Sequence, residues 1–257
     1  MTAPRGSDTR IASGASRGGF SVSSRSATPT VDSGLSAQQL TDFFDRPVLE
    51  VAPQVLGGVL SRSTPEGTVA IRITEVEAYD GRTDPASHAF RGQTARNSSM
   101  FGAPARLYCY FIYGIHHSLN LVCGPIGTPT GLLVRAGEVV EGIDLARRRR
   151  EAKPRKHPLP DAALARGPGC VASCFDADLS QDGASLIGGS WSFAPPATLS
   201  TDIRFGPRIG VKGEGADPHR FAWRFHLGGE PSVSARKSTD RLDLGGNSSI
   251  DLRGHDL

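Results

Sequence analysis

The stretch VAIRITEVEAYDG, residues 69 to 81, constrains the fold of this chain more than any other feature. Alternation predicts a strand with one face that begins with branched aliphatic side chains and continues with two carboxylates and an aromatic ring: Val69, Ile71, Ile73, Glu75, Glu77 and Tyr79. Burying an unpaired carboxylate costs several kcal/mol or forces a large pKa shift. The strand therefore either emerges into water at Glu75 or enters a pocket that uses its carboxylates.

Apolar segments punctuated by glycines predict a single α+β domain over residues 35–236. Strands are expected from Val59 and at 68–79, 106–113, 117–123, 131–136, 207–212 and 220–226. Short helices are expected at 35–47, 52–56 and 142–151, and after Pro168. Because strands dominate and no βαβ period recurs, we expect a curved, mainly antiparallel β-sheet with short flanking helices.

The two ends of the chain differ in composition from the domain between them. Residues 1–34 are rich in Ser, Thr, Gly and Arg, with few large apolar residues, which predicts a disordered tail. The same composition is also compatible with an organelle transit peptide, although no amphipathic helix period is present. Residues 237–257 have a similar polar character and are expected to form a C-terminal tail.

The rest of the composition excludes several classes of protein. No apolar run approaches the roughly 20 residues that span a bilayer, and no signal-peptide core is present. We therefore expect a soluble monomer without membrane partners, cytoplasmic and nucleoid-associated in a bacterium or nuclear in a eukaryote. The four cysteines lack a zinc-binding pattern of Cys and His partners, so we expect reduced core thiols, no metal and no cofactor.

A dense cationic segment, ARRRREAKPRKHP, covers residues 146–158. Its prolines and charges predict an exposed loop. Such a loop is either simply solvated or contacts phosphates of a polyanion. The net charge of the chain, +3, does not decide between these alternatives.

Aromatic and charged residues cluster in the middle of the chain. All four tyrosines fall between residues 79 and 113, and His88 and the loop QTARNSSMF lie in the same interval. A tyrosine-rich strand is often only core. However, rings beside a carboxylate and cations are also what a protein needs to hold a nucleobase outside a duplex. In that case Arg96 and Asn97 of the loop are expected to contact the DNA backbone.

These motifs resemble the alkyladenine (3-methyladenine, or methylpurine) DNA glycosylase family. The resemblance is collinear from about residue 36 to 234 and depends on EVEAYDG, DPASHAFRGQTARNSSMF, LYCYFIYGIHHSLNLV, GLLVRAGEVVEG, LARGPGCVASCFD, GPRIGVKG and FAWRF. It implies a base-excision-repair enzyme that acts on double-stranded DNA with damaged purines. The expected substrates are 3-methyladenine, 7-methylguanine, hypoxanthine and ethenoadenine, in an order that the sequence does not determine.

The resemblance implies a catalytic role for three residues. Glu77 matches the general base that activates a water, and Arg135 matches the arginine that helps to hold this water. The carbonyl group of Ile209 would be the third partner of the water. Glu75 matches no catalytic position and is expected to be structural, paired with a neighbouring cation.

The resemblance also implies a base-binding set. Tyr79 and Tyr110 match the rings that stack on the flipped base, and the backbone of His88 matches the position that contacts the purine edge. Asn120 matches the asparagine that disfavours the 2-amino group of guanine. Tyr113 matches the residue that intercalates into the duplex where the base leaves.

Three other interpretations compete with this one. A carbohydrate glycosidase could use Glu75 and Glu77 as its carboxylate pair, but only two tryptophans are available to line a sugar cleft. A nucleic-acid-binding module without activity could use the tyrosines and the basic segment. A lysine-dependent glycosylase/lyase is suggested by GPRIGVKG alone, without its helix-hairpin-helix context. Base-release assays on alkylated duplex DNA and on a neutral glycoside distinguish among them.

Overall fold

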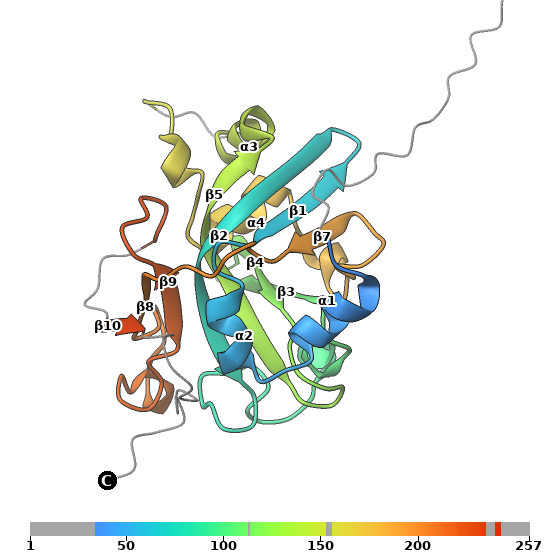
Figure 1. The fold of residues 1–257 in the computed structure, drawn as a ribbon, viewed down its shortest axis with the longest axis vertical. Helices are drawn as coiled ribbons and strands as arrows, with labels where there is room; N and C mark the ends of the chain where they lie inside the picture. The colour runs from blue at the N-terminus through green and yellow to red at the C-terminus, as the bar shows by residue number, and fades with distance from the viewer. Residues whose placement is uncertain (1–33, 113, 153–155, 235–239, 243–257) are drawn as a thin grey trace, which may run out of the picture.

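A computed structural model describes residues 34–112, 114–152, 156–234 and 240–242, and Figure 1 shows their arrangement. The α-helices are α1 (Ala37–Phe44), α2 (Val48–Gln54), α3 (Ile143–Arg150) and α4 (Pro168–Phe175). The strands are β1 (Val59–Thr64), β2 (Gly67–Asp80), β3 (Leu107–Ile112), β4 (His116–Leu121), β5 (Thr130–Glu141), β6 (Ala165–Arg166), β7 (Trp191–Ala194), β8 (Ile203–Gly206), β9 (Arg224–Leu227) and β10 (Asp240–Leu242). Short 3-10 helices are η1 (Ala95–Phe101), η2 (Asp161–Ala163), η3 (Leu179–Gln181) and η4 (Glu214–Ala216).

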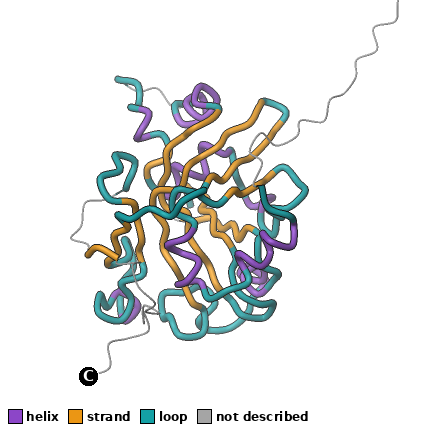
Figure 2. Tube along the Cα trace, in the orientation of Figure 1, coloured by secondary structure: helices purple, strands orange, loops and turns teal. Residues whose placement is uncertain are grey.

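Within the described residues, ten strands form one sheet with the order β10-β8-β9-β2-β5-β4-β3. In addition, β1 pairs with β2 and β7, and β6 pairs with β5. All of these strand pairs are antiparallel. Strands β2 and β5 are the longest, with 14 and 12 residues, and they lie at the centre of the molecule (Figure 2). The predicted α+β class with a mainly antiparallel sheet is confirmed.

The first two helices follow from local sequence signals. Ser36 forms a capping box with Gln39 at the start of α1, within the range 35–47 that was predicted to be helical. The helix expected at 52–56 is wrong in its bounds, because α2 begins at Val48 and includes Pro53. Its buried residues follow the helical period from Val48 onward, so its position depends on packing against the sheet.

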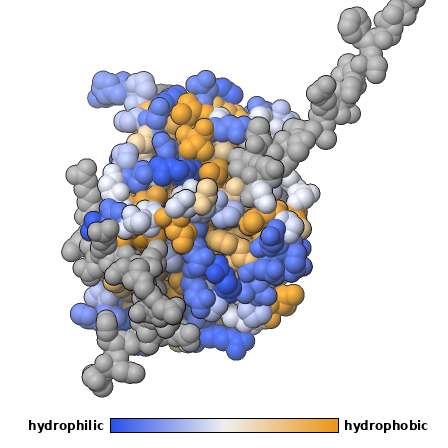
Figure 3. Space-filling view, in the orientation of Figure 1, coloured by the Kyte–Doolittle hydropathy of each residue, from blue (hydrophilic) through white to orange (hydrophobic). Residues whose placement is uncertain are grey.

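One continuous hydrophobic core joins the helices to the central strands. Phe44 of α1 packs on Phe193 of β7 with their ring centroids 5.3 Å apart. Phe175 of α4 packs on Trp191 of β7 at 5.0 Å. Figure 3 shows that hydrophilic and hydrophobic side chains are interspersed on the visible face of the described part. None of its helices is long and apolar enough to cross a membrane.

Only the first part of the basic segment differs from the exposed loop predicted for it: residues 146–150 lie in α3, whereas Lys156, His157 and Pro158 are exposed and outside any helix. Four of its five arginines, Arg147 to Arg150, lie in α3, and three of these four hold neighbouring parts of the fold. Arg155 lies outside the described residues. Arg147 donates to the carbonyl oxygen of Leu159 at 2.6 Å. Arg149 donates to that of Cys174 at 3.0 Å, and Arg150 to that of Leu164 at 2.7 Å. Their charges therefore serve contacts within the protein, whereas Arg148 is exposed.

Two further expectations near the C-terminal end differ from the structure. The strand predicted at 207–212 is wrong, since β8 ends at Gly206 and a loop follows it. The strand predicted at 220–226 is shorter and later, as β9. Strand β10 falls within the predicted C-terminal tail and pairs with β8, so the sheet extends past residue 236. Residues 1–33 and 243–257 lie outside the described residues.

Candidate active site

The pairing of β2 with β5 is irregular at one place, close to the carboxylates. The register shifts twice there, so that each strand has one residue without a partner opposite, Thr74 in β2 and Arg135 in β5. Such extra residues are β-bulges, which change the direction in which the following side chains point. A third shift, near the start of the pair, lies between Ala70 and Ile71.

The bulges correct the expectation that the carboxylates continue the aliphatic face of the strand. Ile73 belongs to the hydrophobic core before the bulge, and Val76 and Ala78 belong to it afterwards. Glu75 and Glu77 consequently lie on the opposite face of β2 from Ile73. The strand keeps its apolar contacts throughout and still presents two carboxylates to its other face.

Glu77 is fully buried, and both of its carboxylate oxygens have partners. The N–H group of Ile209 donates to Oε1 at 2.7 Å, and Nη1 of Arg135 lies 3.4 Å from the same oxygen. The hydroxyl of Tyr79 donates to Oε2 at 2.9 Å. The expectation for Ile209 concerned its carbonyl group, whereas the structure shows its N–H group in contact with the carboxylate.

The pKa of Glu77 is raised above that of an ordinary glutamate. Burial is the main cause, because it disfavours the charged form. Arg135, the Ile209 N–H and the Tyr79 hydroxyl act in the opposite direction, and the charge of Glu75 adds a smaller increase. The carboxylate is thus a stronger base than an exposed glutamate and is still held by two hydrogen bonds and one ion pair.

Glu77 lies on the wall of a cavity of about 530 Å³. The cavity brings together residues from β2, β3, β4, β5 and the loops after β2 and β8. Its lining includes seven of the residues predicted for the site: Glu77, Tyr79, His88, Tyr110, Asn120, Arg135 and Ile209. It also includes the residues Gly167 to Cys170 at the start of α4. The volume lies in the range of typical small-molecule sites.

Aromatic rings form one side of this cavity. Tyr108 and Tyr110 stack with their centroids 5.4 Å apart and an angle of 29° between the rings. His88 meets Tyr110 edge-on at 4.6 Å, and its Nδ1 lies 2.9 Å from the hydroxyl of Tyr108. The pKa of His88 is lowered by partial burial and by the nearby charge of Arg96. We therefore expect a neutral imidazole at neutral pH.

The loop that carries His88 is held from inside by Asn97. Its amide nitrogen donates to the carbonyl oxygens of His88 and Gly92, at 2.9 and 3.0 Å. Only 2% of Asn97 is exposed, so the structure offers its side chain no route to a DNA backbone. Arg96 is exposed and donates to the carbonyl oxygen of Phe111 at 3.1 Å. Of the two predicted backbone contacts, only Arg96 has an accessible side chain.

Asn120 lies at the base of the cavity, in β4. It is 3% exposed, and its amide nitrogen donates to the carbonyl oxygen of Tyr108 at 3.2 Å. A Cβ atom at Gly131 would lie 3.3 Å from its Oδ1 and 3.4 Å from Cε of Met100. The absence of a side chain at Gly131 therefore leaves room beside the Asn120 oxygen.

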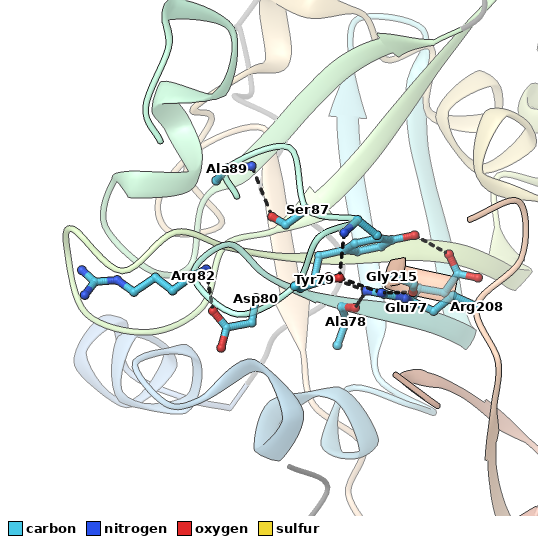
Figure 4. Close-up of polar contacts among 11 residues, drawn as sticks. Glu77, Ala78, Tyr79, Asp80, Arg82, Ser87, Ala89, Arg208 and Gly215 are labelled. Carbon is cyan, nitrogen blue, oxygen red and sulfur yellow. Dashed lines mark hydrogen bonds and ion pairs between the residues drawn. The ribbon is translucent and has the colours of Figure 1, made fainter. Parts of the chain in front are cut away.

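A buried ion pair that was not predicted from the sequence lies beside the ring of Tyr79. Arg208 donates to both carboxylate oxygens of Asp84, at 2.5 and 2.8 Å, and both side chains are fully buried. Arg208 also donates to the carbonyl oxygens of Ala78 and Gly215, each at 2.8 Å (Figure 4). Its Cζ lies 4.5 Å from the centroid of the Tyr79 ring. This cation joins β2 to the loops that carry His88 and Ile209.

A sequence signal for this pair exists, although it is weak. Asp84 falls in DPASHAF and Arg208 in GPRIGVKG, two segments used for the family resemblance. Nothing in the local pattern indicates that a cation so far along the chain turns inward. The remaining predicted site residue, Tyr113, lies outside the described residues. It follows β3 directly and precedes Gly114, whose φ of +68° suits a turn.

Glu75 is paired with cations, as expected. Its Oε1 lies 3.3 Å from Nε of Arg135 and 3.3 Å from Nε of Arg224. Its Oε2 accepts the backbone N–H of Ser234 at 2.7 Å. Glu75 does not line the cavity, and the described residues contain no cluster of His, Cys, Asp and Glu that could hold a metal ion.

Comparison with known proteins agrees with this geometry. A sequence model of the methylpurine-DNA glycosylase (MPG) family matches residues 42–231. A protein from Streptomyces avermitilis is 47% identical over 197 residues, covering 75% of this chain and 89% of that protein. Proteins from Leifsonia xyli subsp. xyli and Methanocella arvoryzae are 46% and 42% identical, covering 78% and 77% of this chain and 93% and 96% of their own lengths. Each is named "Putative 3-methyladenine DNA glycosylase".

A cavity with a buried carboxylate on its wall and stacked tyrosine rings along one side has the features of an enzyme site. The chain belongs to the methylpurine-DNA glycosylase family. It is a DNA glycosylase, a hydrolase of N-glycosidic bonds that acts in DNA repair. The family resemblance predicted from the motifs is thereby confirmed.

Proposed function

We propose that this glycosylase flips alkylated or deaminated purines out of double-stranded DNA and hydrolyses their N-glycosidic bond, leaving an abasic site. The substrates belong to the class of 3-methyladenine, 7-methylguanine, hypoxanthine and ethenoadenine. The observation that carries the proposal is Glu77, a fully buried carboxylate on the wall of a cavity lined by tyrosine rings. A duplex base cannot enter such a cavity without leaving the stack.

Glu77 is the general base in this proposal. A water oxygen forms a bond to C1′, the bond from C1′ to the purine nitrogen breaks, and its electron pair leaves with the purine. The proton of the water passes to Glu77. The carboxylate also stabilises the positive charge that develops on the sugar, as in glycoside hydrolysis. Arg135, 3.4 Å from Oε1, keeps Glu77 ionised and aligned.

The aromatic wall holds the flipped purine. Tyr79 and Tyr110 supply faces on which a base stacks, which contributes roughly 1–3 kcal/mol per base. A purine that carries positive charge is favoured further by electron-rich rings. The backbone of His88 contacts the purine edge, and Asn120 disfavours the 2-amino group of guanine. Tyr113 fills the gap in the stack.

The carbohydrate glycosidase hypothesis fits the geometry less well. It needs both Glu75 and Glu77 at the substrate, but only Glu77 lines the cavity. Glu75 is held by Arg135, Arg224 and Ser234. No strand nicking is expected, since the proposed reaction uses a water rather than a lysine as the nucleophile.

The test is base release by Glu77→Gln from duplex DNA with a single 3-methyladenine or hypoxanthine, under single-turnover conditions with saturating enzyme. The substitution keeps the shape and removes the proton acceptor, so release is expected to fall by more than about 100-fold. Binding to DNA with an abasic-site analogue is expected to stay nearly intact. Glu75→Gln, a second buried carboxylate on the same strand, is the matched control and is expected to slow release without abolishing it.

The pH profile provides a second readout. The base acts only when ionised, so release by the wild type is expected above the pKa of Glu77 and is lost as the pH falls through it. Because burial raises this pKa, the loss should occur at higher pH than for an exposed glutamate. Release by Glu77→Gln within tenfold of the wild type would contradict the proposed role.

A further inference from the structure

Arg135 does not reach Glu77 unaided, because two other groups, the Glu75 carboxylate and the Ser234 hydroxyl, determine where its guanidinium lies. Nε of Arg135 is 3.3 Å from Oε1 of Glu75 and donates to Oγ of Ser234 at 3.0 Å. Nη1 of the same guanidinium is 3.4 Å from Oε1 of Glu77. The guanidinium is a rigid, planar fork, so fixing Nε also fixes the direction of Nη1.

Ser234 belongs to residues 228–234, which we call the C-terminal strap, directly after β9. The strap is tied to β2 at regular intervals. Glu230 pairs with Arg72 at 2.9 Å, and Oγ of Ser232 lies 2.8 Å from Oγ1 of Thr74, the bulge residue. The strap thus follows β2 along the bulge and ends beside Glu75 and Arg135.

Ser234 contacts the buried pair with two different groups. Its backbone N–H donates to Oε2 of Glu75 at 2.7 Å, while its hydroxyl oxygen accepts from Nε of Arg135. The side chain of Arg135 is 11% exposed and that of Glu75 is fully buried, so solvent screens these contacts little. Ser234 consequently bridges Glu75 and Arg135, the ion pair next to Glu77.

We propose that Ser234 is a positioning residue for base release: its hydroxyl orients Arg135, and Arg135 in turn fixes the Glu77 carboxylate so that it can take a proton from the attacking water. This inference rests on the proposed role of Glu77 as general base. Ser234 does not line the cavity, and it lies just beyond residues 42–231, which the family model matches. Its influence on the reaction passes entirely through Arg135.

The experiment compares Ser234→Ala with Ser232→Ala and Ser234→Thr. Ser232→Ala is the matched control, because it removes a hydroxyl from the same strap that contacts Thr74 rather than Arg135. Ser234→Thr retains the hydroxyl and is expected to restore the wild-type behaviour. Each protein is assayed for single-turnover base release across a pH series, for its melting temperature and for binding to abasic-analogue DNA.

Ser234→Ala is expected to slow base release roughly tenfold, equal to about 1.4 kcal/mol of activation free energy. The acidic limb of its pH profile is expected to move to higher pH, because a less firmly held Arg135 neutralises Glu77 less well. Ser232→Ala should keep the wild-type profile.

An unchanged pH profile for Ser234→Ala would overturn the inference. The inference would also be overturned if Ser234→Ala and Ser232→Ala lost base release equally and in proportion to their melting temperatures. The strap would then act on stability alone. Glu77→Gln is measured in parallel. Normal base release by Glu77→Gln would refute the proposed function. If Glu77→Gln loses base release while Ser234→Ala keeps the wild-type rate and pH profile, only the positioning role is refuted.

Discussion

The ion pair between Arg208 and Asp84 should be one of the most sensitive points of the fold. Arg208→Met conserves much of the side-chain volume and removes the cation. The carboxylate of Asp84 then stays fully buried and keeps only the donor N–H of Ala86, at 2.9 Å. The carbonyl oxygens of Ala78 and Gly215 lose their donors at the same time.

Breaking a buried pair by removing one partner costs about 3–5 kcal/mol. A domain of this size is stable by only about 5–15 kcal/mol in total. The melting temperature of Arg208→Met should accordingly fall by roughly 6–20 °C. The double variant Arg208→Met/Asp84→Asn should lose less than the sum of the two single variants, because no charge stays buried without its partner.

Urea denaturation, followed by circular dichroism, measures these free energies of unfolding. Arg220→Met is the matched control, since Arg220 also pairs with a carboxylate, Glu214, at 3.0 Å but is 55% exposed. Exposed pairs contribute about 1 kcal/mol or less. If Arg208→Met cost no more than Arg220→Met, or if the changes at Arg208 and Asp84 were additive, the reasoning from burial would be refuted.

Three further predictions concern the carboxylate, the wedge and the N-terminal segment. Glu77→Gln should raise the melting temperature at neutral pH, because the raised pKa of Glu77 means that its ionised form destabilises the folded state. The gain in melting temperature should shrink as the pH falls toward the pKa of an ordinary glutamate. An equal gain at all pH values would contradict this prediction. Tyr113→Ala should reduce release of well-paired hypoxanthine more than release of the same base in a mismatch, measured in single turnover, whereas equal losses would indicate a packing role. A protein that begins at Leu35 should keep the single-turnover rate of the full chain at saturating enzyme. Its affinity for DNA, measured by fluorescence anisotropy, should be lower than that of the full chain at low salt. This difference in affinity should shrink as the salt concentration rises. A large loss of the saturated rate would show that residues 1–34 belong to the catalytic domain.

The groups around the buried Glu77 stabilise its carboxylate through several contacts. An ionised carboxylate without exposure is unfavourable, yet the proposed chemistry requires it. Arg135, the Ile209 N–H and the Tyr79 hydroxyl offset part of this cost. The second layer of contacts, from Glu75 and Ser234 to Arg135, keeps the compensating charge in place. Stability and activity therefore oppose each other at Glu77.

The sequence by itself determined the elements that depend on neighbours along the chain. The capping box at Ser36 begins α1 where it was predicted, and alternation located the central strand β2 nearly to its ends. The chained motifs identified the family and named seven residues that the structure finds around one cavity. Local dihedral preferences and collinear motifs both depend on short stretches of sequence, and for this reason they could be predicted without the tertiary structure.

Only the tertiary structure decided which face of β2 carries the carboxylates. That face depends on two bulges, and one of them, at Arg135, lies in a strand far along the chain. Similarly, residues 207–212 were predicted to be a strand but form a loop after β8. Its Ile209 N–H instead binds Glu77, and its Arg208 turns inward to Asp84. Pairing partners and buried charges are set by residues distant in sequence, so strand alternation alone did not indicate them.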